Sequence, residues 1–277
     1  MTESRKTLIA ALQNCAGPDV EANLAVLDTL GRDAAGAGAE VLFIPEAFAY
    51  LGPDDGKQRI LEPLPEGGPI LERCQQLASA TRTHVILGGF HERTNTPGKA
   101  YNTCVHLDPD GTIVRMYRKI HLFDVALADG TRLEESARTL PGDKAVTTEL
   151  PYGTHGLTIC YDVRFPALFQ QLADMGAIAM SVPSAFTATT GKAHWHVLLR
   201  ARAIEAQSYV IAPAQHGHNW GKRRSYGHSL IIDPWGQVLA ELPEGDGFIT
   251  AEIDPAEVQR VRSELPSLTH KRTFSPD

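Results

Sequence analysis

The chain has 277 residues, of which 43% are hydrophobic and 21% are charged, a balance typical of a soluble globular protein with a sizeable core. Its formal net charge of −7 at pH 7 argues against nucleic acid or an anionic membrane surface as a partner. No segment approaches the roughly 18 apolar residues of a membrane span, and no secretory signal is expected at the N-terminus. The four cysteines show no CxxC spacing, which favours a reduced cytoplasmic protein.

Apolar and amphipathic segments alternate along the chain, separated by short connections. In the first half, this pattern predicts strands at 8–12, 41–44, 85–88, 103–107 and 113–117, and helices at 19–37 and 69–82. In the second half, it predicts helices at 166–175 and 194–207, strands at 178–182 and 209–212, and a hairpin over 229–240. The alternation indicates an α/β fold.

Two segments of the chain resemble each other. Residues 38–48 and 176–186 match at Gly, Ala, Pro, Ala and Phe, and each copy follows a predicted helix and ends in a strand that stops at proline. This match suggests two related half-units whose sheets face each other, with the strand ends converging on one pocket.

Cys160 lies where an apolar run meets the start of a helix. Residues 156–159 read as a short buried strand, and Pro166 opens the helix that follows. A cysteine there presents its sulfur to a ligand while backbone N–H groups of the turn face the same space. Because a free thiol with a pKa near ~8.5 is only slightly ionised at neutral pH, it needs a base and a cation nearby. The pattern predicts a nucleophile backed by an oxyanion site.

Glu46 and Lys119 also follow predicted strands. Glu46 comes directly after Pro45, which cannot continue the hydrogen-bond ladder of a strand. Its apolar neighbours are expected to raise its pKa by desolvation, which suits a general base; an ordinary exposed glutamate is the alternative. Lys119 suits an oxyanion and a neighbouring thiolate, and its alternative is a solvated charge at a strand end.

Glu46, Lys119 and Cys160, in this chain order, resemble the catalytic triad of the nitrilase superfamily of carbon–nitrogen hydrolases. The motifs that carry the resemblance are IPEAF, YRKIHLFD and ICYDVRFP. The resemblance implies a four-layer α-β-β-α sandwich forming a single domain over 1–277, with 266–277 as a C-terminal tail. It also implies a homodimer or higher homo-oligomer paired across a helical face, and no metal or organic cofactor.

The resemblance implies roles for these residues in the hydrolysis of a carboxamide through a thioester. Cys160 is the expected nucleophile, Glu46 the general base and acid, and Lys119 the oxyanion-binding cation, together with a backbone N–H near Tyr161.

The superfamily pattern contains a second glutamate downstream of the lysine. Glu135 falls at the matching place and would orient Lys119 or the leaving group, and its neighbour Glu134 is the alternative.

Four residues are candidates for binding the substrate. Arg164 would pair with a substrate carboxylate through its planar guanidinium, or form a structural salt bridge with Asp162. Tyr161, Tyr50 and Phe186 would form the walls of the pocket, or fill the core. The expected partner is therefore a small amide that bears a carboxylate.

Within the superfamily, residues 184–206 and the segment SYGHSLIIDPWG are similar to omega-amidases and deaminated glutathione amidases, which hydrolyse the distal amide of 2-oxo acids. Residues 215–228 and Pro166 favour the latter, whose products are 2-oxoglutarate and cysteinylglycine. An omega-amidase acting on 2-oxoglutaramate, or another small carboxamide hydrolase, is the alternative. The larger substrate needs space beyond the scissile nitrogen, which we expect from loops at 187–192 and 215–224.

Two other function classes fit parts of the sequence. His194 and His196, and His216 and His218, have an HxH spacing that suits zinc, which would indicate a metal-dependent amidohydrolase. Helical residues two apart do not share a face, however, and the second pair lacks a neighbouring ligand set of clear spacing. The non-enzymatic alternative is a scaffold with an inactive site, and the complete Glu–Lys–Cys set argues against it.

Overall fold

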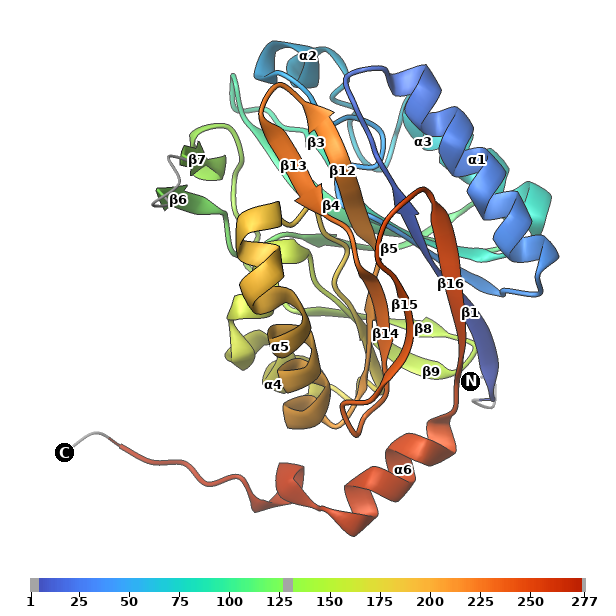
Figure 1. Cartoon of the computed structure of the whole chain (residues 1–277), viewed down its shortest axis with the longest axis vertical. Coiled ribbons are helices and arrows are strands. Elements are labelled where there is room, and N and C mark those ends of the chain that lie inside the picture. Colours follow the sequence, from blue (N-terminus) through green and yellow to red (C-terminus); the bar gives the residue numbers. More distant parts are fainter. Residues whose placement is uncertain (1–4, 127–131, 276–277) are drawn as a thin grey trace.

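The computed structural model describes residues 5–126 and 132–275 and contains two β-sheets that face each other between outer helices (Figure 1). In sheet order, the larger sheet consists of β13 (Arg223–Tyr226), β12 (Ala214–Trp220), β1 (Thr7–Asn14), β2 (Val41–Ile44), β3 (His84–Arg93), β4 (Ala100–Leu107) and β5 (Ile113–Arg118), with β16 (Gly247–Ile253) also paired to β1. The smaller sheet consists of β15 (Val238–Leu242), β14 (Ser229–Ile232), β11 (Tyr209–Ala212), β10 (Ala179–Ser181), β9 (Gly153–Leu157) and β8 (Val146–Leu150).

Helices cover the outer face of each sheet. The larger sheet is covered by α1 (Val20–Gly36) and α3 (Pro69–Thr81), and the smaller sheet by α4 (Pro166–Asp174) and α5 (Ala188–Ala206) (Figure 1). The α-β-β-α sandwich expected from the sequence is therefore confirmed.

The remaining elements are short or peripheral. They are α2 (Asp54–Arg59), the two-stranded ribbon of β6 (Asp124–Ala126) and β7 (Arg132–Glu134), α6 (Pro255–Glu264), and the 3-10 helices η1 (Glu135–Ala137), η2 (Cys160–Arg164) and η3 (Ser267–His270). After α6, the chain leaves the body of the protein as an extended segment (Figure 1). No helix in the described ranges combines the length and the apolar character needed to cross a membrane.

The central strands of the larger sheet are buried on both faces. Val41 and Phe43 of β2 point into the core between the sheets, while Leu42 and Ile44 pack in the second core under α1 and α3. The ring of Phe43 lies 5.2 Å from the ring of His155 in β9, so the two sheets are in direct contact. Parallel strands covered on both sides are expected to be continuously apolar, as β2 is.

The carboxyl ends of β2 and β10 meet, as the matching segments 38–48 and 176–186 predict. Each strand is central in its sheet and is followed by a proline, Pro45 or Pro183. Gly88 separates them: a Cβ atom at this position would lie 2.0 Å from Cβ of Pro183 and 2.4 Å from the carbonyl oxygen of Ile44. Only glycine fits here, which lets the loops after both strands open into the same space.

Two expected loops are regular structure instead. The segment 187–192 forms the first turns of α5, which begins at Ala188 and not near residue 194. Its Thr-Thr-Gly sequence has low intrinsic helix propensity, but Thr190 and Gly191 are buried, so packing overrides that propensity. The segment 215–224 belongs to the hairpin of β12 and β13. Because its histidines and glycines interrupt the alternation of apolar and polar residues, the sequence does not indicate a strand here. Pairing with neighbouring strands stabilises the extended conformation.

Candidate active site

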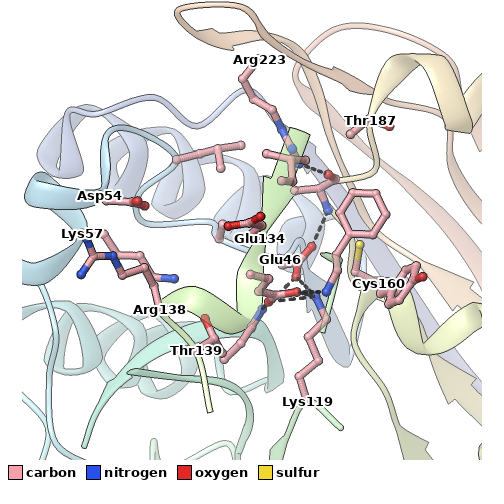
Figure 2. Close-up of a pocket in the computed structure, with 18 of the residues that line it drawn as sticks. Glu46, Asp54, Lys57, Lys119, Glu134, Arg138, Thr139, Cys160, Thr187 and Arg223 are labelled. Carbon is pink, nitrogen blue, oxygen red and sulfur yellow. Dashed lines mark hydrogen bonds and ion pairs between the residues drawn. The ribbon is translucent and has the colours of Figure 1, made fainter. Parts of the chain in front are cut away.

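The structure brings Glu46, Lys119 and Cys160 together at the wall of a cavity of about 550 Å³ (Figure 2). Glu46 follows β2, Lys119 follows β5, and Cys160 follows β9 at the start of η2. All three are buried: Glu46 and Cys160 are 7% exposed and Lys119 is 2% exposed. The volume lies within the usual range for small-molecule sites.

The turns that present two of these residues contain strained backbone. Cys160 has a φ of 49° and Ala47, directly after Glu46, has a φ of 56°, in the left-handed region that favours glycine. Such conformations cost about 1–3 kcal/mol each and persist only where surrounding contacts fix them. The contacts here are hydrogen bonds from the Cys160 N–H to the carbonyl of Pro183 (2.9 Å) and from the Ala47 N–H to that of Gly89 (3.3 Å). Strained turns of this kind cluster at functional sites.

The ammonium of Lys119 lies between two carboxylates. Its Nζ donates to Glu46 Oε1 at 3.0 Å and to both oxygens of Glu135, at 3.1 and 2.9 Å. Glu134 is turned away and pairs with Arg132 at 2.7 Å. Of the two adjacent glutamates, Glu135 is therefore the one that contacts Lys119.

Asn102 of β4 is a member of this network that the sequence did not reveal. Its Nδ2 donates to Glu46 Oε1 at 2.9 Å and to Glu135 Oε1 at 3.2 Å, and its backbone carbonyl accepts a hydrogen bond from the backbone N–H of Lys119 at 2.8 Å. The second Glu46 oxygen accepts the Ala185 N–H at 2.8 Å. The only signal in the sequence was a polar residue at the edge of an apolar strand.

Charge pairing determines the ionisation of Glu46. Burial alone would raise its pKa, as we expected from its apolar neighbours. The positive charge of Lys119 and hydrogen bonds from Cys160, Ala185 and Lys119 outweigh burial and lower the pKa of Glu46 to about 2. The expectation of a raised pKa is therefore wrong for the free enzyme, because the sequence did not show that a cation would lie 3.0 Å from the carboxylate.

The thiol and the lysine respond in the opposite direction. Burial raises the pKa of the Cys160 thiol, and the neighbouring negative charge of Glu46 raises it further. For Lys119, the two carboxylates outweigh burial and raise its pKa well above the ordinary value. The free site therefore holds a neutral thiol, an ionised carboxylate and a charged ammonium.

Asp162 braces the loops that carry Lys119 and Cys160. This fully buried carboxylate accepts hydrogen bonds from the hydroxyl of Tyr117 (2.6 Å), the N–H of Ile159 (2.9 Å) and the N–H of His121 (3.1 Å). Tyr117 and His121 lie on either side of Lys119 in the sequence, and Ile159 directly precedes Cys160. One side chain therefore fixes the positions of both turns relative to each other.

Three of the four candidate substrate-binding residues line the cavity. These are Tyr50, Tyr161 and Phe186. Arg164 lies outside the lining, with its guanidinium 5.8 Å from the ring centre of Tyr161 and 5.2 Å from that of Phe186. Within the described residues, the guanidinium of Arg164 contacts His194 Nδ1 at 3.3 Å and forms no ion pair with Asp162, so the alternative of a structural salt bridge with Asp162 is wrong.

None of the four histidines with HxH spacing lines the cavity. His216 bonds to Asp246 at 2.9 Å, and His218 bonds to the carbonyl of Gly221 at 2.6 Å. His196 lies with His228 and Glu241 in a separate cluster whose ligand atoms are within 4.8 Å of one another. This cluster is distinct from the thiol site.

Several cations line the cavity. Arg223 of β13 belongs to the segment 215–224 that we expected to shape the pocket, whereas Lys57 of α2 and Arg132 and Arg138, on either side of Glu135, had no signal in the sequence. They come from segments far apart in the chain, and only the fold brings them to one cavity.

The low pKa of Glu46 makes a prediction about stability. We expect Glu46→Gln to lower the free energy of unfolding by about 3 kcal/mol near neutral pH, because the ionised carboxylate no longer pairs with Lys119. A group with a depressed pKa stabilises the folded state above its unfolded pKa, so this contribution is lost as the pH falls from about 4.5 to about 2. Urea unfolding of both proteins at several pH values measures the difference, and a difference that does not shrink in acid contradicts the pairing.

Comparison with known proteins agrees with this geometry. The family model "Carbon-nitrogen hydrolase" matches residues 8–263. Deaminated glutathione amidase from Bos taurus is 44% identical over 97% of this chain and 83% of that protein, and the one from Synechocystis sp. is 43% identical over 95% of this chain and 97% of that protein. The NitFhit protein of C. elegans superposes with a TM-score of 0.90 at 36% identity, covering 97% of this chain, which spans 66% of the length of that longer protein. The chain belongs to the carbon–nitrogen hydrolase family, the nitrilase superfamily, and is a hydrolase of carbon–nitrogen bonds other than peptide bonds.

Proposed function

We propose that this hydrolase splits the distal amide of deaminated glutathione into 2-oxoglutarate and cysteinylglycine, with Cys160 as the nucleophile. The observation that supports the chemistry is the thiol of Cys160 beside the buried Glu46–Lys119–Glu135 network, at the wall of a cavity of about 550 Å³. The choice of substrate is supported by the names of relatives that are 43% and 44% identical over nearly the whole chain.

In the first step, the sulfur of Cys160 attacks the amide carbon while its proton passes to Glu46. Glu46 has a low pKa in the free enzyme because Lys119 is close to it. As the carbonyl oxygen gains negative charge, Lys119 interacts with that oxygen, so its effect on Glu46 weakens and the carboxylate becomes more basic. The backbone N–H of Tyr161, in the first turn of η2, is a second donor to this oxygen, because N–H groups there lack intrahelical acceptors.

In the second step, the tetrahedral intermediate collapses. The carbon–nitrogen bond breaks, Glu46 gives its proton to the leaving nitrogen, and a thioester remains on Cys160. Water then attacks the thioester and loses a proton to Glu46, which returns it to the departing sulfur. Glu135 keeps Lys119 charged throughout. These steps require no metal or organic cofactor.

We also propose that the protein is a homodimer paired through the outer face of α5. Four large apolar side chains are exposed on this face and on the adjacent β14–β15 hairpin: Val197 (68%), Ile204 (47%), Trp235 (56%) and Leu239 (41%). The helix and the hairpin are in contact, because Arg200 of α5 donates to the carbonyl of Gly236 in the hairpin turn at 2.8 Å. A second copy would remove these side chains from water.

All four cysteines are free thiols, which suits the cytoplasm as the location.

Substrate preference tests the proposed reaction. We expect kcat/KM for deaminated glutathione to exceed that for 2-oxoglutaramate by about 10-fold or more, equivalent to about 1.4 kcal/mol of transition-state binding. Cys160→Ala should turn over neither amide and serves as the blank. A preference for 2-oxoglutaramate would make this an omega-amidase, and activity in Cys160→Ala would refute the thiol mechanism.

Sedimentation tests the dimer. Ile204→Asp is expected to shift the protein from dimer to monomer, because it places a charge in the apolar patch. Val114→Asp, a matched change at a 37% exposed position on β5, should leave the dimer intact. A monomeric wild type, or an Ile204→Asp variant that remains dimeric, would refute this interface.

A further inference from the structure

The cavity has more positive charge than its catalytic network uses. Lys119 is neutralised by Glu46 and Glu135, and Arg132 is paired with Glu134. The remaining lining cations, Lys57, Arg138 and Arg223, form no ion pair with any carboxylate of the described ranges. Asp54 is the one lining carboxylate left without a cation within ion-pair distance there.

These three cations lie at two separate places in the cavity. Figure 2 shows Lys57 and Arg138 on the far side from Cys160, while Arg223 enters from another direction above Glu46. Arg223 donates to the carbonyl of Ala185, whose own N–H donates to Glu46 at 2.8 Å, so Arg223 lies beside the carboxylate that accepts a hydrogen bond from Cys160. Lys57 lies on the other side of the cavity, where the charges of Glu135 and Asp54 act on it.

The environment of Arg223 suits an anionic ligand. Its Nη2 donates to the carbonyl of Ala185 at 2.5 Å, which fixes the guanidinium beside the site. Its Nε is buried and has no hydrogen-bond partner within the described part of the chain. A buried donor without an acceptor is costly, and a carboxylate fits the fork of a guanidinium. Burial also lowers the pKa of Arg223, as expected where no anion compensates its charge.

Lys57 also lacks a paired carboxylate. The residue is half-buried, its ammonium has no hydrogen bond to any residue of 5–126 or 132–275, and burial lowers its pKa although the charges of Glu135 and Asp54 act in the opposite direction. Arg138, the third cation, is exposed and lies at the same side of the cavity (Figure 2). A bound carboxylate would compensate both charges.

We propose that the cavity recognises a substrate with a carboxylate at each end, one held by Arg223 and the other by Lys57 with Arg138. The inference rests on the proposed function for the direction of the substrate. Glu46 and Glu135 lie on the side where the leaving nitrogen accepts its proton, so the leaving group extends towards Lys57. The acyl chain then extends from Cys160 towards Arg223. Arg223 binds the 2-oxo acid carboxylate, and Lys57 binds the terminal carboxylate of the dipeptide.

Binding of the two product halves tests this assignment without turnover. In a Cys160→Ala background, calorimetry measures the Kd of 2-oxoglutarate and of serylglycine, which replaces the thiol of cysteinylglycine by a hydroxyl. Arg223→Gln should weaken 2-oxoglutarate by about 10-fold or more and serylglycine by less than about 3-fold. Lys57→Gln should give the reverse pattern.

Two neighbouring substitutions serve as controls. Arg224→Gln on β13 and Arg59→Gln on α2 remove exposed charges that do not line the cavity, and both should leave the two Kd values within about 2-fold. Equal weakening of both ligands by Arg223→Gln and Lys57→Gln, no effect of either, or no binding to the Cys160→Ala parent would overturn the proposal.

A kinetic measurement separates this proposal from the proposed function. Lys57→Gln should lower the ratio of kcat/KM for deaminated glutathione to that for 2-oxoglutaramate by about 10-fold, because only the larger substrate has the second carboxylate. If wild type hydrolyses neither amide but the binding pattern holds, the proposed substrate is wrong and the two cationic subsites stand. If wild type prefers deaminated glutathione and the ratio is unchanged in Lys57→Gln, the proposed substrate stands and the assignment of the subsite at Lys57 is wrong.

Discussion

A buried ammonium between two carboxylates holds the active site together. Lys119 is 2% exposed, and its Nζ contacts Glu46 at 3.0 Å and Glu135 at 2.9 Å. Burying these charges is costly unless each one is paired, so the loops after β2 and β5 and the η1 segment must all keep their positions. Asn102 adds hydrogen bonds to both carboxylates. The site is therefore built before a substrate arrives, which is the arrangement that electrostatic catalysis needs.

The same pairing keeps the thiol of Cys160 protonated in the free enzyme. With Glu46 ionised and Lys119 engaged, burial and the carboxylate keep the pKa of the Cys160 thiol raised. In the proposed mechanism, a developing oxyanion draws the charge of Lys119 towards itself, which makes Glu46 basic enough to take the proton. The proposal thus couples activation of the thiol to the presence of an amide carbonyl in the site.

The sequence predicted the alternating strands and helices and the three residues after strand ends, because strand periodicity and the prolines at 45 and 183 are local signals, while the four-layer arrangement was implied by the resemblance to the nitrilase superfamily. It did not predict the ionisation of Glu46, since that depends on the distance to Lys119, 73 positions away. Arg164 was a reasonable candidate by proximity in sequence, yet the turn of η2 directs it behind Tyr161 and Phe186. The cations at 57 and 138 had no local pattern, and for Arg223 the sequence indicated only the segment 215–224, because tertiary packing brings these side chains together.

Trapping the covalent intermediate tests the central claim most directly. The enzyme is mixed with deaminated glutathione, quenched in acid within the first turnover, digested and examined by mass spectrometry. The account predicts a 2-oxoglutaryl group bound as a thioester to the peptide that contains Cys160, and no such adduct in Cys160→Ala. An adduct on a different residue, or full turnover by Cys160→Ala, would contradict it.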